Sequence, residues 1–456
     1  MLNRAIADAR KEAAVGAEDS GQVYDAIVVG SGPGGATVTR ELARAGRRVL
    51  LLEKGRERRR LGTYAAALSV LDRFGFFRSR EGLPLLKVTA LGGATVLYSA
   101  SAAMPPPWLA ERYGIDLGPW AEATARELGV ATLPEAYLGE ASRAIMAAGN
   151  RLGQSWEPMP KLLDVSKFRN GRDAGARTSL GLNHGERWTA VEFVRQAERA
   201  GATVLTRAEC TEVVVEGGRA TGVVARVHGA GERRFSGRVV ILAAGGIPTP
   251  VLLKRAGIEN AGVGCVVDPT LLVYGIMPGT GTYRDPLVSV VTWKWYDSDG
   301  IRIGTLIDPW LMTLLSLAKT GLGHVPKILR YRRMAGILVK VKDEIGGFVD
   351  ENGEVSKALT RSDLEKIEKG YRIAREVLIE AGCPPRTVVR GEIRGAHPSG
   401  TCRIGEVVDE NLKTAIDGLY VCDASVFPEA LDRPTVITII AFGRRLSEHL
   451  LEGELA

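Results

Sequence analysis

Residues 24–35 read YDAIVVGSGPGG, and this stretch decides the fold. A largely apolar strand at 24–30 runs into a glycine-rich turn, and a helix is predicted over 34–45. A second strand is predicted at 48–53, where the chain reads RVLLLE. Strand, helix and strand of these lengths form a parallel βαβ unit. A G-x-G-x-x-G pattern at its first turn is typical of dinucleotide binding.

The residues of this unit fit a dinucleotide for physical reasons. Gly30 permits the turn, Gly32 lets the backbone approach a pyrophosphate, and Gly35 lets the helix pack against the strand; Gly34 belongs to the same loop. The helix N-terminus favours phosphate. Glu53 ends the second strand, where a carboxylate binds ribose hydroxyls and disfavours the 2′-phosphate of NADP. The loop alone leaves FAD and NAD open.

Composition bounds the remaining choices. A chain of 456 residues is long enough for two or three intertwined domains. The net charge is +7, with one dense basic run at 56–60 that fits a solvated surface better than contact with a polyanion or an anionic membrane, and no nucleic-acid partner is expected. Five scattered cysteines without a C-x-x-C pair, and histidines without metal-ligand spacing, predict neither a disulfide framework nor a metal site. With no signal peptide or spanning segment apparent, a cytoplasmic location is expected.

Further elements follow from periodicity. A β-hairpin is predicted around Gly217–Gly218, and a strand buried on both faces at 239–245. The best-marked helix spans 363–381, with Ser362 and Glu365 as its capping box. Alternation predicts strands at 293–297 and 301–307, and a last helix is predicted over 434–451.

Taken together, five separated stretches resemble the glucose–methanol–choline (GMC) oxidoreductases, a family of FAD-dependent alcohol oxidases and dehydrogenases. They are YDAIVVGSGPGG (24–35), LGGATVLYSAS (91–101), VVILAAGGIPTPVLLKRAGI (239–258), HPSGTCRIG (397–405) and DASVFP with the final helix (423–450). The resemblance implies an α/β fold with a discontinuous, three-layer (ββα) Rossmann-like FAD domain and an α+β substrate domain on an antiparallel sheet. The expected FAD domain comprises 20–101, 201–267 and 385–456, and the substrate domain 102–200 and 268–384.

The same resemblance implies cofactor contacts. It would place Gly92, Gly93 and Thr95 against the flavin and pyrophosphate, and the backbone of Val213 against the adenine. Asp423 would hold the ribityl chain or phosphate. Pro434 and Thr435 open the last helix, whose positive end would face the flavin. Some family members attach FAD through a histidine in the glycine segment, but residues 85–103 contain none, so non-covalent FAD is expected.

His397 occupies the position of the family's catalytic base. Removing a hydride from an alcohol carbon requires that the hydroxyl proton be taken up, and an imidazole suits that task near neutral pH. The resemblance implies that His397 lies beside the flavin ring.

Arg433 is a departure from the family pattern, in which a second His or Asn precedes the proline of the last helix. Arginine is always charged and cannot act as a base. Its guanidinium would instead pair with Asp432, stabilise reduced flavin, or bind a carboxylate or carbonyl of the substrate.

Residues 309–334 are apolar and then basic. They fit a lid or a membrane-surface segment, and equally a helical insertion packed on the substrate sheet. Trp293, Trp295, Trp310 and Phe348 would line an apolar pocket or fill the core.

The sequence therefore predicts an FAD enzyme that oxidises the CH–OH group of a bulky, apolar alcohol by hydride transfer to flavin N5. Oxygen or a quinone would act as electron acceptor, and peripheral membrane contact through 309–334 remains one of the alternatives for that segment. Four alternatives remain open: a dehydrogenase or reductase acting on enone or isoprenoid C–C bonds, a GMC-type lyase, a photodecarboxylase, and a non-catalytic electron-transfer flavoprotein.

Overall fold

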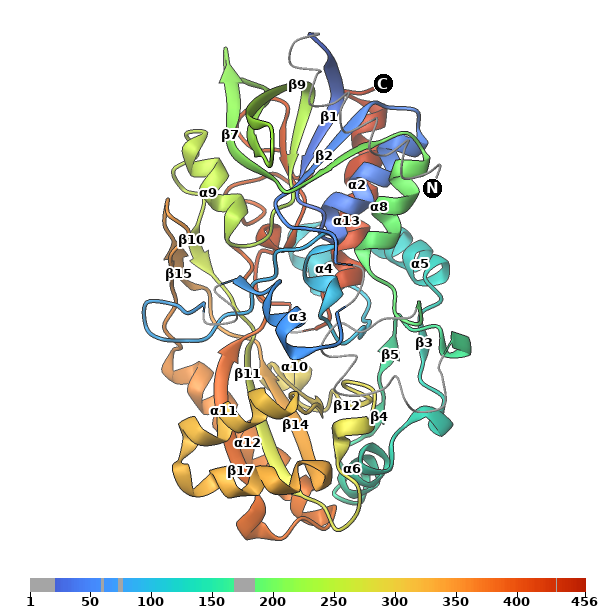
Figure 1. Cartoon of the computed structure of the whole chain (residues 1–456), viewed down its shortest axis with the longest axis vertical. Coiled ribbons are helices and arrows are strands. Elements are labelled where there is room, and N and C mark those ends of the chain that lie inside the picture. Colours follow the sequence, from blue (N-terminus) through green and yellow to red (C-terminus); the bar gives the residue numbers. More distant parts are fainter. Residues whose placement is uncertain (1–20, 59–60, 73–76, 168–184, 432) are drawn as a thin grey trace.

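Two large sheets lie one above the other in the computed structural model, which describes residues 21–58, 61–72, 77–167, 185–431 and 433–456 (Figure 1). The upper sheet has seven strands in the order β6-β2-β1-β9-β8-β7, with β18 also paired to β9. Their bounds are β1 (Val23–Val29), β2 (Val49–Glu53), β6 (Thr203–Thr206), β7 (Ala208–Glu216), β8 (Arg219–Val227), β9 (Gly231–Leu242) and β18 (Leu419–Val421).

Strand β9 belongs to both the antiparallel and the parallel part of the upper sheet. Its first half pairs antiparallel with β8, and its second half runs parallel to β1 and to β18. Val239–Leu242, at the end of the second half, are continuously buried, as expected for a parallel strand covered on both faces. Helices α2 (Pro33–Arg44), α8 (Ala190–Arg199) and α13 (Val436–Glu452) pack beside this sheet, and α2 contacts both of the others (Figure 1).

The lower sheet is antiparallel, in the order β17-β11-β14-β13-β12-β4. Its strands are β4 (Trp156–Pro158), β11 (Pro269–Ile276), β12 (Val290–Thr292), β13 (Ile301–Thr305), β14 (Met334–Val341) and β17 (Val389–Gly395). Helices α6 (Glu140–Arg151) and α12 (Arg361–Glu380) cover the face that carries Ile337 and Val339. Helix α11 (Trp310–Thr320) and the 3₁₀ segment η6 (Leu322–Arg333) cover the face that carries Leu338.

Shorter elements complete the described chain. A three-stranded sheet joins β10 (Val263–Cys265), β15 (Gly346–Val349) and β16 (Val355–Ser356), and β3 (Ala131–Thr132) pairs with β5 (Pro160–Lys161). The other helices are α3 (Tyr64–Leu68), α4 (Trp108–Tyr113), α5 (Gly118–Glu127), α9 (Pro248–Arg255) and α10 (Tyr296–Asp299). None of the helices described is both long and apolar enough to cross a bilayer.

The predicted fold class is confirmed, and the βαβ unit begins and ends within one residue of its expected bounds. The chain passes repeatedly between the two sheets: α8, at 190–199, packs on α2, whereas β17, at 389–395, pairs with β11. The domain boundaries proposed from the sequence stay a prediction.

Two local predictions were wrong. The capping box of α12 consists of Thr360 and Asp363 rather than Ser362 and Glu365, because Thr360 Oγ1 accepts from Asp363 N (3.1 Å) and the Asp363 carboxylate accepts from Thr360 N (2.9 Å). Residues 293–297 are not a strand. The chain turns there into the short helix α10, which ends at Gly300 with φ +64°.

Candidate active site

The glycine loop between β1 and α2 has closed and open sides. A Cβ added at Gly30, Gly34 or Gly35 would lie 2.3 Å or less from a backbone oxygen, so these positions require glycine for packing. A Cβ at Gly32 would meet nothing within 4 Å. Gly32 is also the N-cap of α2 and brings no side-chain cap, which leaves the first amides of the helix available. The open position with its uncapped helix end suits a pyrophosphate.

Glu53 is a buried carboxylate at the end of β2. Its Oε2 accepts from Ser31 N (3.0 Å) and Ser31 Oγ (2.6 Å), and its Oε1 accepts from Gly55 N (2.6 Å). Burial raises the pKa of Glu53, and these hydrogen bonds oppose the shift. Three of about four acceptor positions are thus used by the protein, which leaves one on Oε1 for a ribose hydroxyl.

The LGGAT segment lies against the glycine loop. Gly92 N donates to Ser31 Oγ (2.9 Å), and a Cβ at Gly93 would lie 3.0 Å from Gly32 Cα. Gly92 and Gly93 have φ of +91° and +56°, a region that favours glycine. Thr95 Oγ1 donates to Gly92 O (2.5 Å) and accepts from Ala190 N (3.0 Å). Thr95 therefore fixes the segment against the start of α8.

Asp423 joins two loops at the carboxyl end of the parallel strands. Its Oδ2 accepts from Gly245 N (2.8 Å) and Thr249 Oγ1 (2.6 Å), and its Oδ1 accepts from Ser425 N (2.8 Å). The carboxylate is thus largely engaged by protein groups. A role in binding the cofactor directly stays a prediction.

The N-terminus of α13 lies beyond this loop. Pro434 precedes Thr435, which is the N-cap and contributes no side-chain hydrogen bond. In the first turn, Thr438 Oγ1 is buried and has no hydrogen-bond partner within the described part of the chain. A buried hydroxyl normally has a partner, so this orphan and the open cradle at Gly32 both fit a bound dinucleotide. Val213 is buried in β7, paired with Val223; its contact to the adenine stays a prediction.

His397 belongs to a buried cluster of three ionisable side chains. Its Nδ1 lies 2.9 Å from Asp268 Oδ2 and 2.7 Å from Lys340 Nζ. Lys340 Nζ also lies 2.9 Å from Asp268 Oδ2, and both of these side chains are only 2 % exposed. His397 Nε2 has no partner among the residues that are described, and 36 % of the His397 side chain is exposed. The cluster therefore engages one ring nitrogen and presents the other.

Charge within the cluster sets its protonation. Burial lowers the pKa of His397, the Lys340 ammonium lowers it further, and the Asp268 carboxylate opposes both. Burial alone would raise the pKa of Asp268, but Lys340 and His397 outweigh it, and that pKa lies well below its usual value. The lowered pKa of His397 favours the neutral imidazole. Two tautomers satisfy the contacts: Nδ1–H donates to Asp268, or Nδ1 accepts from Lys340.

Arg433 is held by two neighbouring segments. Its Nε donates to Tyr296 Oη (3.0 Å), its Nη1 donates to Met104 O (3.1 Å), and the guanidinium lies 4.6 Å from the Tyr296 ring centroid. The expected partner Asp432 lies outside the described residues. These contacts fix the guanidinium just before the start of α13.

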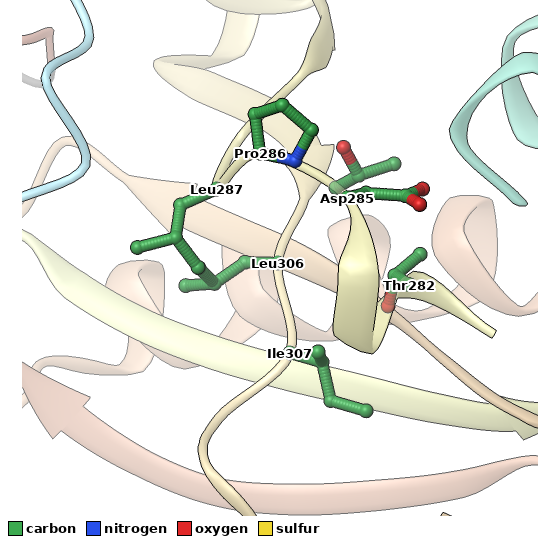
Figure 2. Close-up of a pocket in the computed structure, with 7 residues that line it drawn as sticks. Thr282, Asp285, Pro286, Leu287, Leu306 and Ile307 are labelled. Carbon is green, nitrogen blue, oxygen red and sulfur yellow. The ribbon is translucent and has the colours of Figure 1, made fainter. Parts of the chain in front are cut away.

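One small pocket is lined by Thr282, Asp285, Pro286, Leu287, Thr305, Leu306 and Ile307 (Figure 2). Asp285 accepts from Ser142 N (2.9 Å) and Ser142 Oγ (2.7 Å), so its carboxylate ties α6 to this turn. None of the lining residues belongs to the His397 cluster, and we interpret the pocket as a packing feature.

Four aromatic residues were expected to line an apolar pocket or to fill the core. Trp310 and Phe348 are exposed, whereas Trp293 and Trp295 are partly buried against the lower sheet. Sequence reasoning missed Asp268 and Lys340. One signal was available, since Lys340 interrupts the apolar run of β14 and a lysine in a buried strand needs a partner.

Comparison with known families agrees with this geometry. Models described as GMC oxidoreductase match residues 92–268 and 354–443, and a model described as an NAD(P)-binding Rossmann-like domain matches residues 28–69. A GMC-type oxidoreductase of Mycobacterium tuberculosis is 26 % identical over 93 % of this chain and 75 % of its own length. The long-chain-alcohol oxidase FAO4B of Arabidopsis thaliana is 24 % identical over 96 % of this chain and 69 % of its own length.

Solved structures show the same fold. A formate oxidase variant from Aspergillus oryzae superposes with a TM-score of 0.68 at 14 % identity, covering 95 % of this chain and 99 % of that one. Pyridoxine 4-oxidase from Mesorbium loti superposes with a TM-score of 0.67 at 17 % identity, covering 94 % and 99 %.

Substitutions at two glycines should separate cofactor binding from folding. We expect Gly32→Ala to leave the fold intact, since its Cβ enters open space, but to weaken FAD binding, since that space is the expected position of the pyrophosphate. Gly34→Ala should instead destabilise the protein, because its Cβ would lie 1.9 Å from Cys422 O. Flavin fluorescence and thermal unfolding of the apoprotein measure the two effects. Normal FAD affinity in folded Gly32→Ala would contradict the assignment.

Proposed function

The chain belongs to the GMC oxidoreductase family and its cofactor is FAD, and from this premise we propose that it oxidises the CH–OH group of a bulky, apolar alcohol. The observation that carries the proposal is His397, whose side chain is partly exposed and whose Nδ1 contacts the buried Asp268–Lys340 pair. The similarity of the chain to long-chain-alcohol oxidases supports an apolar alcohol as the substrate class. The FAD is proposed to be non-covalent.

His397 takes the hydroxyl proton in this proposal. For that role Nε2 must hold a lone pair, so Nδ1 must carry the hydrogen and donate it to Asp268. Asp268 then positions the ring and favours the imidazolium that forms, as the carboxylate does in a Ser-His-Asp triad. Bound FAD would accept the hydride at N5 and pass electrons to oxygen or a quinone-like acceptor.

Lys340 has two opposing effects on the pKa of His397. It keeps Asp268 ionised, and the Asp268 carboxylate raises the pKa of His397. Its own ammonium charge lowers that pKa, which favours the neutral imidazole. If Lys340 instead donates to Nδ1, then Nε2 carries a hydrogen and acts as a donor toward the substrate. That tautomer would suit the reduction of an enone or carbonyl.

Replacing His397 tests the proposed base. We expect His397→Ala to retain FAD but to slow flavin reduction by the alcohol by about 10²–10⁴-fold, the usual effect of losing a general base. Stopped-flow bleaching without oxygen measures this step, first against a panel of alcohols, enones and fatty acids. Reoxidation should not change. Reduction of the variant at the normal rate, or bleaching by enones or fatty acids but by no alcohol, would overturn the proposal.

The pH profile should report on the two positioning residues. Flavin reduction should rise as the pH rises through the pKa of His397 and then level off, because only the neutral imidazole accepts a proton. Lys340→Met should move this rise to higher pH, since Lys340 lowers the pKa of His397. Asp268→Asn should move it to lower pH and slow the reaction.

A double variant controls for damage to the fold. Breaking a buried ion pair costs about 3–5 kcal/mol, whereas Asp268→Asn/Lys340→Met removes both charges together. The ¹⁵N chemical shifts of His397 give its tautomer and pKa independently of turnover. An unchanged pKa in all three variants would show that the pair has only a structural role.

Arg433 is proposed as an electrostatic partner of the flavin or substrate. A fixed guanidinium near developing negative charge in a water-poor site favours that charge by several kcal/mol, which a neutral amide only partly replaces. Arg433→Asn should therefore slow flavin reduction and lower the flavin midpoint potential. Tyr296→Phe is the matched control, because it removes one anchoring hydroxyl but keeps the charge. Equal potentials in wild type and Arg433→Asn would remove Arg433 from the site.

A further inference from the structure

Helix α11 exposes two large apolar side chains and buries two hydroxyl groups, although Leu317 packs into the core and Lys319 is exposed. Thr313 and Ser316 are buried, where Thr313 Oγ1 donates to Asp308 O (3.0 Å) and Ser316 Oγ accepts from Glu392 N (3.2 Å). Trp310 and Leu315, in contrast, are 49 % and 42 % exposed. A helix on the surface of a water-soluble domain normally shows the opposite arrangement. The outer side of α11 is therefore suited to an apolar environment.

The η6 segment extends this apolar surface. Leu322 and Leu329 are 80 % and 88 % exposed. Between and beside them, Ile328 and Tyr331 are buried against β11 and β14 and anchor the segment to the sheet. The exposed leucines therefore belong to an ordered segment that packs on the sheet, and their exposure is not that of a loose chain end. Together with Trp310 and Leu315 they form what we call the α11–η6 face.

The charge of the α11–η6 face identifies its partner. Residues 309–334 contain two lysines and three arginines but no acidic residue. Arg330, Arg332 and Arg333 are exposed, and no ion pair joins them to a carboxylate of the described residues. Apolar side chains flanked by cations suit the headgroup region of an anionic bilayer. A second copy bound through the same face would bring the two sets of cations together, which disfavours a symmetric dimer there.

We infer that the α11–η6 face docks onto the surface of an anionic lipid bilayer. Leu322, Leu329, Trp310 and Leu315 enter the acyl boundary, and the arginines contact lipid phosphates. Helix α11 has 11 residues, too few to span a bilayer, so the face lies on the membrane.

This face lies on the same side of the lower sheet as the His397 cluster. Leu338 of β14 packs with Leu317 and Ile328, and Lys340, two residues further along the strand, projects from the same face and contacts His397. Docking would therefore bring the membrane to the side of the sheet that carries the proposed base. Delivery of an apolar alcohol from the bilayer rests on the proposed function, whereas docking itself does not.

Vesicle flotation of the full-length holoenzyme tests the docking. The protein should float with vesicles of equimolar phosphatidylcholine and phosphatidylglycerol and bind vesicles of phosphatidylcholine alone much more weakly. Leu322→Gln/Leu329→Gln should lower the partition coefficient about tenfold or more, given the apolar area involved. Arg330→Glu/Arg332→Glu/Arg333→Glu should lower it about a hundredfold or more on anionic vesicles.

Matched controls lie elsewhere on the surface. Leu364→Gln on α12, where Leu364 is 45 % exposed, and Arg126→Glu on α5 should leave flotation unchanged. Failure of the wild type to bind anionic vesicles would overturn the inference. Binding of Leu322→Gln/Leu329→Gln as strong as that of the control Leu364→Gln would overturn it as well. A dimer seen by light scattering that Leu322→Gln/Leu329→Gln dissociates would show that a second copy covers the face instead. Flotation without oxidation of any alcohol would contradict only the proposed function.

Discussion

Contact between backbones that only glycine permits holds distant parts of the chain together. Gly34 of the first loop lies against the carbonyl of Cys422 near the C-terminus, and a Cβ there would be 1.9 Å from that oxygen. Gly246 lies equally close to the carbonyl of Pro398, beside the proposed base, with a Cβ distance of 2.1 Å. A side chain at either position would force these loops apart. The cofactor loop and the His397 loop therefore keep a fixed relation to each other.

Two buried lysine–aspartate pairs fix the backbone beside His397. Lys340 pairs with Asp268, and Lys357 pairs with Asp343 at 2.9 Å with both side chains fully buried. Asp343 Oδ1 accepts from Asp268 N (3.0 Å), so the second pair holds the backbone that carries the first. Asp268 has φ +48°, an uncommon conformation for a residue other than glycine, which these contacts maintain. Burial raises the pKa of Asp343 to about 6, although Lys357 opposes the shift.

The motifs at both ends of the chain could be predicted because their glycines and His397 act through local backbone geometry. Asp268 and Lys340 could not, because their meeting depends on the register between β11 and β14, in which Thr270 lies opposite Lys340. No local pattern fixes the pairing of strands that far apart in sequence. The capping error on α12 is of a different kind: two overlapping candidate boxes lie two residues apart, and only hydrogen bonds distinguish them. Composition predicted the apolar segment at 309–334 but not which of its faces is buried.

The order of strands along the chain has a consequence for biosynthesis. Strand β18, from residues 419 to 421, covers the edge of β9 at Val240–Leu242, and α13 follows it. A ribosome-bound chain that lacks residues 419–456 has already made β9 but leaves that edge unpaired and without its covering helix. Exposed edges and apolar surface are what chaperones bind in nascent chains. A chain without residues 419–456 would therefore lack both a neighbour for the end of β9 and the helix that packs on α2.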